Sequence, residues 1–326
     1  MCGRTACTLA PDVICRACSY KDPSSDKFKK PSWKEHPESK DSSTSYTYYG
    51  STNIAPTKFT PVMIRSNTPS SADEEPREIM PMMFGMIPYY HKEEAKSHGL
   101  STNNCRLEGL LESKLYKRSW NQRKFCVILA QGFYEWQTVG ATGKGKKQPY
   151  LIYMPQDAED KKPINIGDKD LWESSEWNEE DGWKGPKILK IAGLYDVWKA
   201  PNGDDVYSYT IITMESNDTL SWLHDRMPAI LDTEESVAAW LNATPKTPTS
   251  ELMSILKPVK SLQWHPVDPK VGNSRCHDTD CMEPKKPEER KPTFMDSWVK
   301  RTPVVKVKAE ESTEEDESKT KKAKTE

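Results

Sequence analysis

Short hydrophobic runs separated by polar turns predict that β-strands make up most of the folded chain. The continuous apolar run Phe125–Ala130 is typical of a buried strand. A Gly/Lys-rich turn separates the segment that follows it from Pro149–Met154, and this pattern predicts a hairpin. Ile188–Trp198 and Val206–Met214 are two more predicted strands around a Pro/Asn/Gly turn, and Ser261–Val267 is the last.

Helical spacing is rarer and predicts three short helices. Four leucines between residues 107 and 115 recur at helical spacing and predict the first. Asp232 and Glu235 resemble a capping box for a second helix that extends to Asn242, and residues 250–256 form a third. Strands in clusters, with helices between some of them and no βαβ rhythm or internal repeat, predict an α+β domain with an antiparallel or mixed sheet.

Polar segments interrupt this pattern and set the expected domain boundary. Residues 20–50, 66–78 and 155–185 are polar and aperiodic, which predicts long loops within one domain. From Asn273 to the end the chain is rich in Pro, Lys and Glu, and we expect a disordered tail over 273–326. The folded domain is therefore predicted over residues 2–272.

Short motifs in the predicted tail suggest partners. Residues 293–301 (TFMDSWVKR) have hydrophobic positions at roughly helical spacing that would suit a partner, such as a replication-fork protein, although a chance hydrophobic island explains them equally well. Val307–Glu310 fits the hydrophobic-Lys-x-Glu pattern for SUMO attachment at Lys308. The lysines of 319–324 resemble a weak nuclear-localisation signal, or else a solvated charge run.

Composition limits the broad class of protein. The 326 residues are 35% hydrophobic and 29% charged, which favours one large domain or two smaller ones with long polar segments. No run approaches the ~20 apolar residues of a membrane helix, and the N-terminus lacks the apolar core of a signal peptide. We expect an intracellular protein, monomeric and without membrane contact, whose eight cysteines are mostly thiols. The net charge of −2 leaves room for a local basic site for nucleic acid.

No cofactor or metal is expected. The sequence holds neither a GxxxxGK[ST] phosphate loop nor a strand-anchored GxGxxG. Cys15 and Cys18 form a lone CxxC pair, and the other candidate zinc ligands, Cys276, His277 and Cys281, lie in the predicted tail. Cys15 and Cys18 are therefore expected on a short helix near the core.

The second residue, Cys2, has the most distinctive candidate chemistry. Removal of Met1 would leave its amine and thiol on adjacent carbons, so that both can bond to one aldehyde carbon and close a thiazolidine ring. An amine with a pKa near ~7.7–8 and a thiol near ~8.5 are both accessible as nucleophiles close to neutral pH. The alternative is that a cysteine stands at this position by accident.

Three polar residues are candidates for acid–base or positioning roles. Glu135 lies among aromatic residues in GFYEW, where shielding from water suits a carboxyl group to proton transfer, although simple strand alternation would put it at the surface. His224 lies beside Asp225 in a turn closed by a proline, and the alternative is a surface helix end. Asn104 precedes the leucine-rich segment, where it is either a helix N-cap or part of an anion site.

Further residues are candidates for contact with a nucleic acid. Arg106 at a predicted helix start suits a phosphate, and Pro56 and Phe84 are rigid apolar residues beside turns. Such wedges unstack bases in some proteins and only pack in most.

Taken together and in order, the motifs resemble one family, the SOS response-associated peptidase (SRAP) family, in its animal branch of abasic site processing proteins. The resemblance spans roughly residues 2–270. It rests on these motifs, in chain order: Met1-Cys2-Gly3-Arg4, Asn53-Ile54-Ala55-Pro56-Thr57, Gly85-Met86-Ile87-Pro88, Asn104-Cys105-Arg106, Gly132-Phe133-Tyr134-Glu135-Trp136, Tyr209-Thr210-Ile211-Ile212-Thr213 and His224-Asp225-Arg226-Met227-Pro228-Ala229-Ile230-Leu231.

The resemblance implies a barrel-like mixed sheet, and an enzyme that recognises abasic sites in single-stranded DNA and traps them covalently. Cys2 would supply the amine and thiol, and Asn104 would hold the amine by hydrogen bonding. His224 or Glu135 would assist opening of the sugar, and Glu135 would shuttle protons and could help to reopen the adduct. A nuclear location at chromatin and replication forks follows as an expectation, with a cytoplasmic pool not excluded.

The resemblance also nominates residues that contact DNA. Arg4, Arg106 and Arg226 would bind phosphates, which carry no sequence information. Pro56 and Phe84 would wedge or stack on neighbouring bases. The matched motifs add Asn53 and Thr213 as the remaining DNA contacts.

The chain departs from the usual family pattern at two aromatic positions. It has Met83-Phe84-Gly85 where the family usually has Arg-Trp-Gly, and Tyr90 where a Trp is usual. One cation is gone, which is compatible with weaker DNA affinity or altered strand preference. The crosslinking chemistry is not implied to be lost.

Other functions fit parts of the pattern. Cys2 with His224 and Glu135 could form a cysteine-peptidase triad, most simply for autocatalytic removal of Met1. A non-covalent reader of modified DNA bases, or a scaffold that works through its tail, are the remaining alternatives.

Overall fold

The computed structural model describes residues 3–22, 25–39, 45–66, 76–137, 147–156 and 164–285. Residues 1–285 form one compact unit. Cys2, the segment 293–301 and Lys308 lie outside the described residues, so the expectations stated for them stay predictions.

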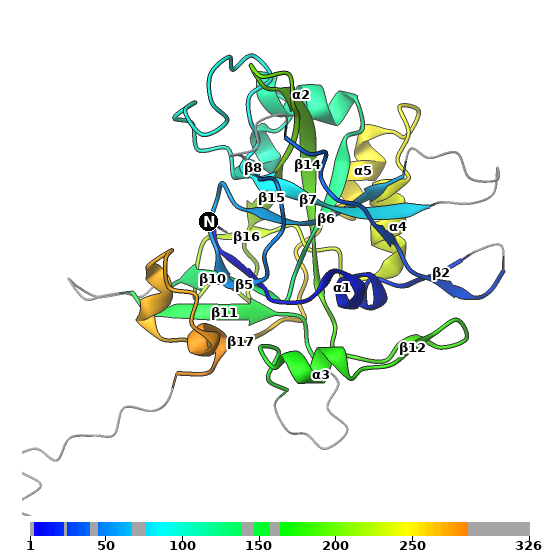
Figure 1. The fold of residues 1–326 in the computed structure, drawn as a ribbon, viewed down its shortest axis with the longest axis vertical. Coiled ribbons are helices and arrows are strands. Elements are labelled where there is room, and N and C mark those ends of the chain that lie inside the picture. The colour runs from blue at the N-terminus through cyan, green and yellow to red at the C-terminus, as the bar shows by residue number, and fades with distance from the viewer. Residues whose placement is uncertain are drawn as a thin grey trace, which may run out of the picture. The chain divides into compact units, whose positions relative to one another are not determined.

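A closed barrel of mixed strands forms the larger part of the fold (Figure 1). Its members, in order around the ring, are β7 (Arg77–Phe84), β6 (Phe59–Arg65), β9 (Phe125–Ala130), β14 (Leu189–Lys199) and β15 (Asp205–Glu215). The ring closes where β15 runs parallel to β7 and pairs Ser208 with Met83. All residues of β9 are buried, which explains why that stretch is apolar without alternation. The predicted barrel-like mixed sheet is confirmed.

A second, antiparallel sheet carries the N-terminal strand. In order across the sheet, its strands are β17 (Gln263–Pro266), β11 (Pro149–Tyr153), β10 (Gly132–Trp136), β1 (Thr5–Cys7) and β5 (Ser51–Ile54). Thr5 pairs with Phe133 on one side and with Ile54 on the other, so β1 lies between β10 and the edge strand β5. This sheet forms most of the surroundings of the candidate site.

Short strands complete the two sheets and two small hairpins. They are β8 (Asn104–Arg106) and β16 (Arg226–Pro228) on β15, β4 (Ser32–Trp33) on β7, and the hairpins of β2 (Tyr20–Lys21) with β3 (Phe28–Lys29) and β12 (Trp177–Asn178) with β13 (Gly182–Trp183). The predicted loops over 20–50 and 155–185 therefore contain short elements. The two hairpins are in contact: the Phe28 amide donates a hydrogen bond to the Glu179 carbonyl at 2.7 Å.

The helices are short and lie between strands. They are α1 (Pro11–Ala17), α2 (Lys114–Asn121), α3 (Lys169–Glu173), α4 (Glu234–Leu241) and α5 (Thr249–Ile255), with the 3₁₀ turns η1 (Leu107–Gly109), η2 (Pro269–Gly272) and η3 (Thr279–Met282). The single helix predicted over the leucines is instead η1 followed by α2, because Ser113 caps a new helix by accepting from the Tyr116 amide. Thr233, and not Asp232, caps α4 in a box with Ser236. None of the helices in the described ranges is long and apolar enough to cross a membrane.

The packed chain continues past the predicted boundary at residue 272. We call residues 267–285 the C-terminal cap. Cys281 and Met282 in the cap are fully buried, in a small core with Tyr134 of the second sheet. The Tyr134 hydroxyl donates to the Thr52 carbonyl at 2.7 Å and lies 3.3 Å from the Cys281 carbonyl. Residues 273–285 are mostly polar, and their few buried apolar side chains did not stand out in the sequence. The prediction of a disordered tail from residue 273 is therefore wrong for residues 273–285.

Candidate functional site

Glu135 lies on β10 and is 6% exposed. Strand alternation alone allowed a surface position, and the structure excludes it. Tyr150 of β11 lies directly opposite Glu135 in the antiparallel register. Gly132, earlier in β10, allows the close approach of β11, because an added Cβ would lie 2.8 Å from the Ile152 carbonyl oxygen.

His224 lies in the turn before β16 and faces Glu135. Its Nε2 is 3.9 Å from Glu135 Oε1, and the two side chains are 15% and 8% exposed. The separation is too long for a direct hydrogen bond. A small group placed between the two side chains, or a modest movement of either, would let a proton pass from one to the other.

The other ring nitrogen of His224, Nδ1, has two neighbours, of which one is a hydrogen-bond donor and the other an acceptor. Nδ1 lies 3.0 Å from the Arg226 amide, from which it can accept, and 2.6 Å from Asp225 Oδ1, to which it can donate only when protonated. Both forms of the imidazole therefore have a partner on this side. With the proton on Nδ1 and donated to Asp225, Nε2 is the ring nitrogen that can accept a proton from a bound group.

Asn104 lies in β8 and is not a helix N-cap, because Arg106 occupies the N-cap position of η1. Its Oδ1 is buried and has no hydrogen-bond partner among the described residues. A buried acceptor without a donor costs about 1–3 kcal/mol. Such an atom is therefore suited to accept a hydrogen bond from a bound group, for example an amine.

The strand β15 brings Asn104 and His224 to the same end of the barrel. Thr213 near the end of β15 pairs with Arg106 of β8 on one side and with Pro228 of β16 on the other. The N-terminal strand β1 reaches this region from the second sheet, since the Tyr134 amide donates to the Arg4 carbonyl. Continued by one residue, the same register sets Gly3 level with Glu135.

The arginines nominated as DNA contacts differ in how many hydrogen bonds they already make with the protein. Arg226 forms a fork with both carboxylate oxygens of Glu108 at 2.8 Å and donates to the Thr213 carbonyl at 2.8 Å. Hydrogen bonds from Arg226 lower the pKa of Glu108. Arg4 donates to Asn53 Oδ1 at 2.8 Å and to a carbonyl of the C-terminal cap at 3.0 Å, and partial burial lowers the pKa of Arg4. Arg106 is exposed on β8.

Three of the nominated DNA contacts are buried in the structure. Phe84 is fully buried and stacks on Tyr209 with ring centroids 5.2 Å apart. Thr213 is fully buried, and Asn53 is 1% exposed with its amide nitrogen donating to three carbonyls of the C-terminal cap. These side chains contribute to the packing and the hydrogen bonding of the fold. Pro56 is half-buried in a turn beside Thr57, which has a φ of 75°.

An aromatic cluster of Tyr150, Trp222 and Trp264, from segments other than GFYEW, was not predicted. The ring of Trp222 lies edge-on to Tyr150 at 5.0 Å and 5.6 Å from Trp264. Trp264 is 38% exposed. The signal was available in part, because pairing GFYEW with PYLIY in a hairpin sets Tyr150 opposite Glu135.

The cysteines of the CxxC pair lie at the core, as predicted. Cys15 lies on α1 and Cys18 caps its C-terminal end. Burial raises the pKa of the Cys15 thiol to about 11 and that of Cys18 to about 12. Among the residues that the structure describes, no group of three or more His, Cys, Asp or Glu side chains is arranged to hold a metal ion.

Comparison with solved structures defines the class of fold. A crystal structure of a protein from Bacteroides thetaiotaomicron superimposes with a TM-score of 0.57 at 20% identity, covering 87% of this chain and 100% of that chain. A second, from Bordetella bronchiseptica, has a TM-score of 0.54 at 19% identity, covering 82% and 100%. These likenesses establish the fold.

Comparison of sequences gives the family. The model of the family described as SOS response associated peptidase (SRAP) matches residues 1–274, and this chain belongs to that family. Abasic site processing protein HMCES of Xenopus tropicalis is 39% identical over 285 residues, covering 86% of this chain and 78% of that protein. The protein of the same name from Rattus norvegicus is 37% identical, covering 87% and 76%. Abasic site processing protein YoqW of Bacillus subtilis is 29% identical, covering 65% and 75%.

Proposed function

We propose that this protein processes abasic sites in single-stranded DNA and that Cys2 forms a covalent thiazolidine with the opened sugar. Membership of the SRAP family and the names of its relatives support abasic-site processing. The covalent step rests on the chemistry available to an N-terminal cysteine. The adduct would shield the site from strand cleavage.

The reaction needs no redox partner. The Cys2 amine adds to the C1′ aldehyde of the abasic sugar and loses water, which gives an imine. The Cys2 sulfur then adds to the imine carbon, its proton ends on the nitrogen, and the five-membered ring closes. Loss of the imine removes the species that would drive β-elimination and strand cleavage.

The polar residues at the meeting point of the two sheets have matching roles in this proposal. Asn104 Oδ1, buried and without a partner in the described chain, accepts from the Cys2 amine. Glu135 and His224 move protons as the sugar ring opens and as water leaves. The observation that carries the proposal is the Glu135–His224 pair, 3.9 Å apart and mostly buried. In a shielded site these groups exchange protons with a substrate in preference to bulk water.

A crosslinking experiment tests the proposal. The full chain, verified by mass to lack Met1, is incubated with a single-stranded oligonucleotide that carries one abasic site and is run on a denaturing gel. We expect a crosslink with wild type and with Cys105→Ser, and none with Cys2→Ser. Cys105 is a matched control because its thiol is fully buried.

Other outcomes would count against the proposal. No crosslink from the wild-type chain would overturn it. Cleavage of a supplied peptide that is lost in Cys2→Ala, without any DNA adduct, would favour the peptidase function instead.

A further inference from the structure

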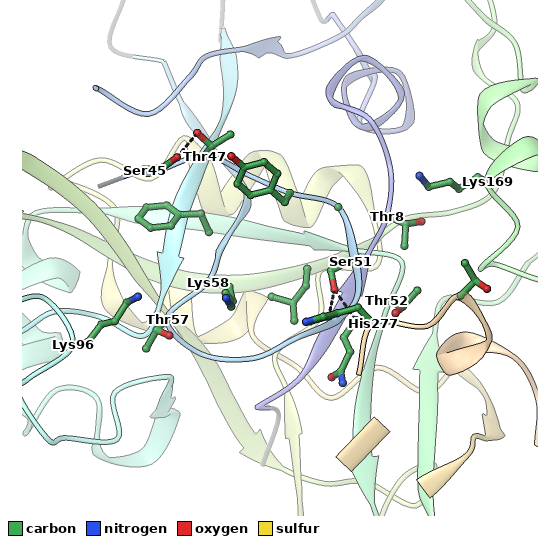
Figure 2. A pocket seen from close by; sticks show the side chains of 16 residues that line it. Thr8, Ser45, Thr47, Ser51, Thr52, Thr57, Lys58, Lys96, Lys169 and His277 are labelled. Carbon is green, nitrogen blue, oxygen red and sulfur yellow. Dashed lines mark hydrogen bonds between the residues drawn. The ribbon is translucent and has the colours of Figure 1, made fainter. Parts of the chain in front are cut away.

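A pocket of about 490 Å³ lies along the edge strand β5 (Figure 2). Neither Glu135 nor His224 is among the residues that line it. Its lining includes Lys58, Lys96 and Lys169, and we call it the lysine groove. In Figure 2, Lys96 and Lys169 lie on opposite sides of the view with Lys58 between them. The three lysines come from distant parts of the chain, so the fold and not the local sequence gathers them.

The charge of the lysine groove is not neutralised by the described chain. No Asp or Glu is among the residues that line it. Lys58, Lys96 and Lys169 are exposed, and none of them forms an ion pair with any residue in the described ranges. Other exposed lysines do: Lys27 pairs with Glu179 and Lys199 with Asp205.

Uncharged groups in the lysine groove also suit a phosphate chain. The hydroxyl side chains of Ser51 and Thr57 line it, whereas those of Thr8 and Thr52, also in the lining, donate to acceptors of the protein itself. Ser51 is held by His277 of the C-terminal cap, whose Nδ1 lies 2.9 Å from Ser51 Oγ. Tyr49, also in the lining, is 72% exposed. Unpaired cations, hydroxyls and an exposed aromatic ring form the combination by which proteins follow a single nucleic-acid strand.

We propose that the lysine groove binds the phosphodiester backbone of single-stranded DNA next to the abasic site. This inference rests on the proposed function. Strand β5 is separated from β10 only by β1, and neighbouring strands are about 4.8 Å apart, so β5 lies about 10 Å across the sheet from Glu135. A strand held at the site can therefore enter the groove within a few nucleotides.

The test measures binding separately from crosslinking. The full chain carrying Cys2→Ser is titrated with a labelled, undamaged single strand, and fluorescence anisotropy gives Kd at several salt concentrations. Each phosphate contact contributes about 0.7 to the slope of log Kd against log salt for a single strand. The triple variant Lys58→Gln, Lys96→Gln, Lys169→Gln should reduce that slope by about 2. The control Lys27→Gln, Lys184→Gln, Lys199→Gln removes the same charge from ion-paired positions and should leave the slope unchanged.

A second variant separates stacking from charge. Tyr49→Ser should weaken binding about tenfold and leave the slope as in wild type. A salt slope as in wild type in the triple lysine variant would overturn the inference. Displacement of the labelled DNA by a poly-aspartate peptide at a lower concentration than by unlabelled DNA would also overturn it. The undamaged strand distinguishes the two proposals. Absence of any crosslink with normal groove-dependent binding would defeat the proposed function alone, and a normal crosslink with a groove-independent slope would defeat this inference alone.

Discussion

The Glu135–His224 pair and the lysine groove border the same five-stranded sheet and are built in opposite ways. Glu135 lies on an inner strand and is almost completely buried, with His224 as its neighbour at 3.9 Å. The lysines of the groove lie near the edge strand, are exposed, and have no carboxylate partner in the described part of the chain. The first arrangement favours proton transfer and the second favours attraction of phosphates, so rate and affinity should respond to different substitutions.

The contacts of the arginines show that the Glu135–His224 pair and the lysine groove should be treated as separate regions. Arg4 and Arg226 each lie two residues from a candidate catalytic residue in the sequence, and both donate hydrogen bonds to the protein itself. Arg226 fixes the segment after His224 to Glu108 and β15, and Arg4 ties β1 to the C-terminal cap. Their charge therefore serves first to position the site. Our proposal therefore assigns phosphate binding mainly to the lysine groove and to exposed Arg106.

The largest expected effect comes from Glu135→Gln. We expect crosslinking to slow by roughly 10²–10⁴-fold, the usual loss when a general acid–base is removed. The affinity for undamaged single-stranded DNA should stay as in wild type, because the amide keeps the volume of the carboxyl group. Single-turnover gels give the rate and anisotropy gives the affinity. Glu112→Gln, an exposed carboxylate on the same molecule, is the control. An equal loss of affinity would mean that the two regions are not separate.

Phe84→Ala should act on stability and not on DNA directly. The ring is fully buried against Tyr209 across the closure of the barrel, so its removal should lower the free energy of unfolding by about 3–5 kcal/mol. Urea unfolding measures this, and Phe84→Leu should cost much less because most of the volume remains. Unchanged stability with weakened DNA binding would restore Phe84 as a stacking residue.

Asn53→Ala should loosen the C-terminal cap. The Asn53 amide satisfies carbonyls at Val271, Asn273 and Cys276 and accepts from Arg4. Leaving these buried groups without partners should cost about 1–3 kcal/mol. Hydrogen exchange should accelerate at residues 271–276 more than in the barrel. Asn178→Ala, whose side chain bonds only within its own hairpin, should leave the cap protected, and equal protection in both variants would contradict the role of Asn53.

The sequence predicted the buried strands well where burial imposes an unbroken apolar run. The run at 125–130 became β9, and 149–154 and 206–214 match β11 and β15 within a residue. The pair β6 and β7 was not predicted, because each carries a proline that argues against a strand. Pro61 and Pro81 lie opposite each other in the ladder, so both missing N–H groups fall on one residue pair.

The residue types of the candidate site could be predicted from the sequence, but the ion pairs and hydrogen bonds of its charged residues could not. Glu135 and His224 could be selected by residue type and surroundings, and the fold brings them together from segments far apart in the chain. Whether an arginine is free depends on partners such as Glu108 and Asn53, which only the tertiary structure supplies. The lysine groove has no local signal, since its lysines come from three separate segments.

The smallest expected effect is a pH dependence of stability that arises from two histidines whose pKa burial lowers. Burial lowers the pKa of His265, which packs between Tyr153 and the Met282 carbonyl. Burial also lowers the pKa of His36 beside the barrel. The unfolded chain then binds protons more readily than the folded one, so stability present above pH ~6.5 is lost as the pH falls through the lowered pKa values. Each histidine contributes at most about 1.4 kcal/mol per pH unit.

Urea unfolding between pH 7.5 and 5.5 measures this slope, and His265→Gln should reduce it while leaving the contribution of His36. A slope that stays as in wild type in His265→Gln would contradict the role of His265 in this pH dependence.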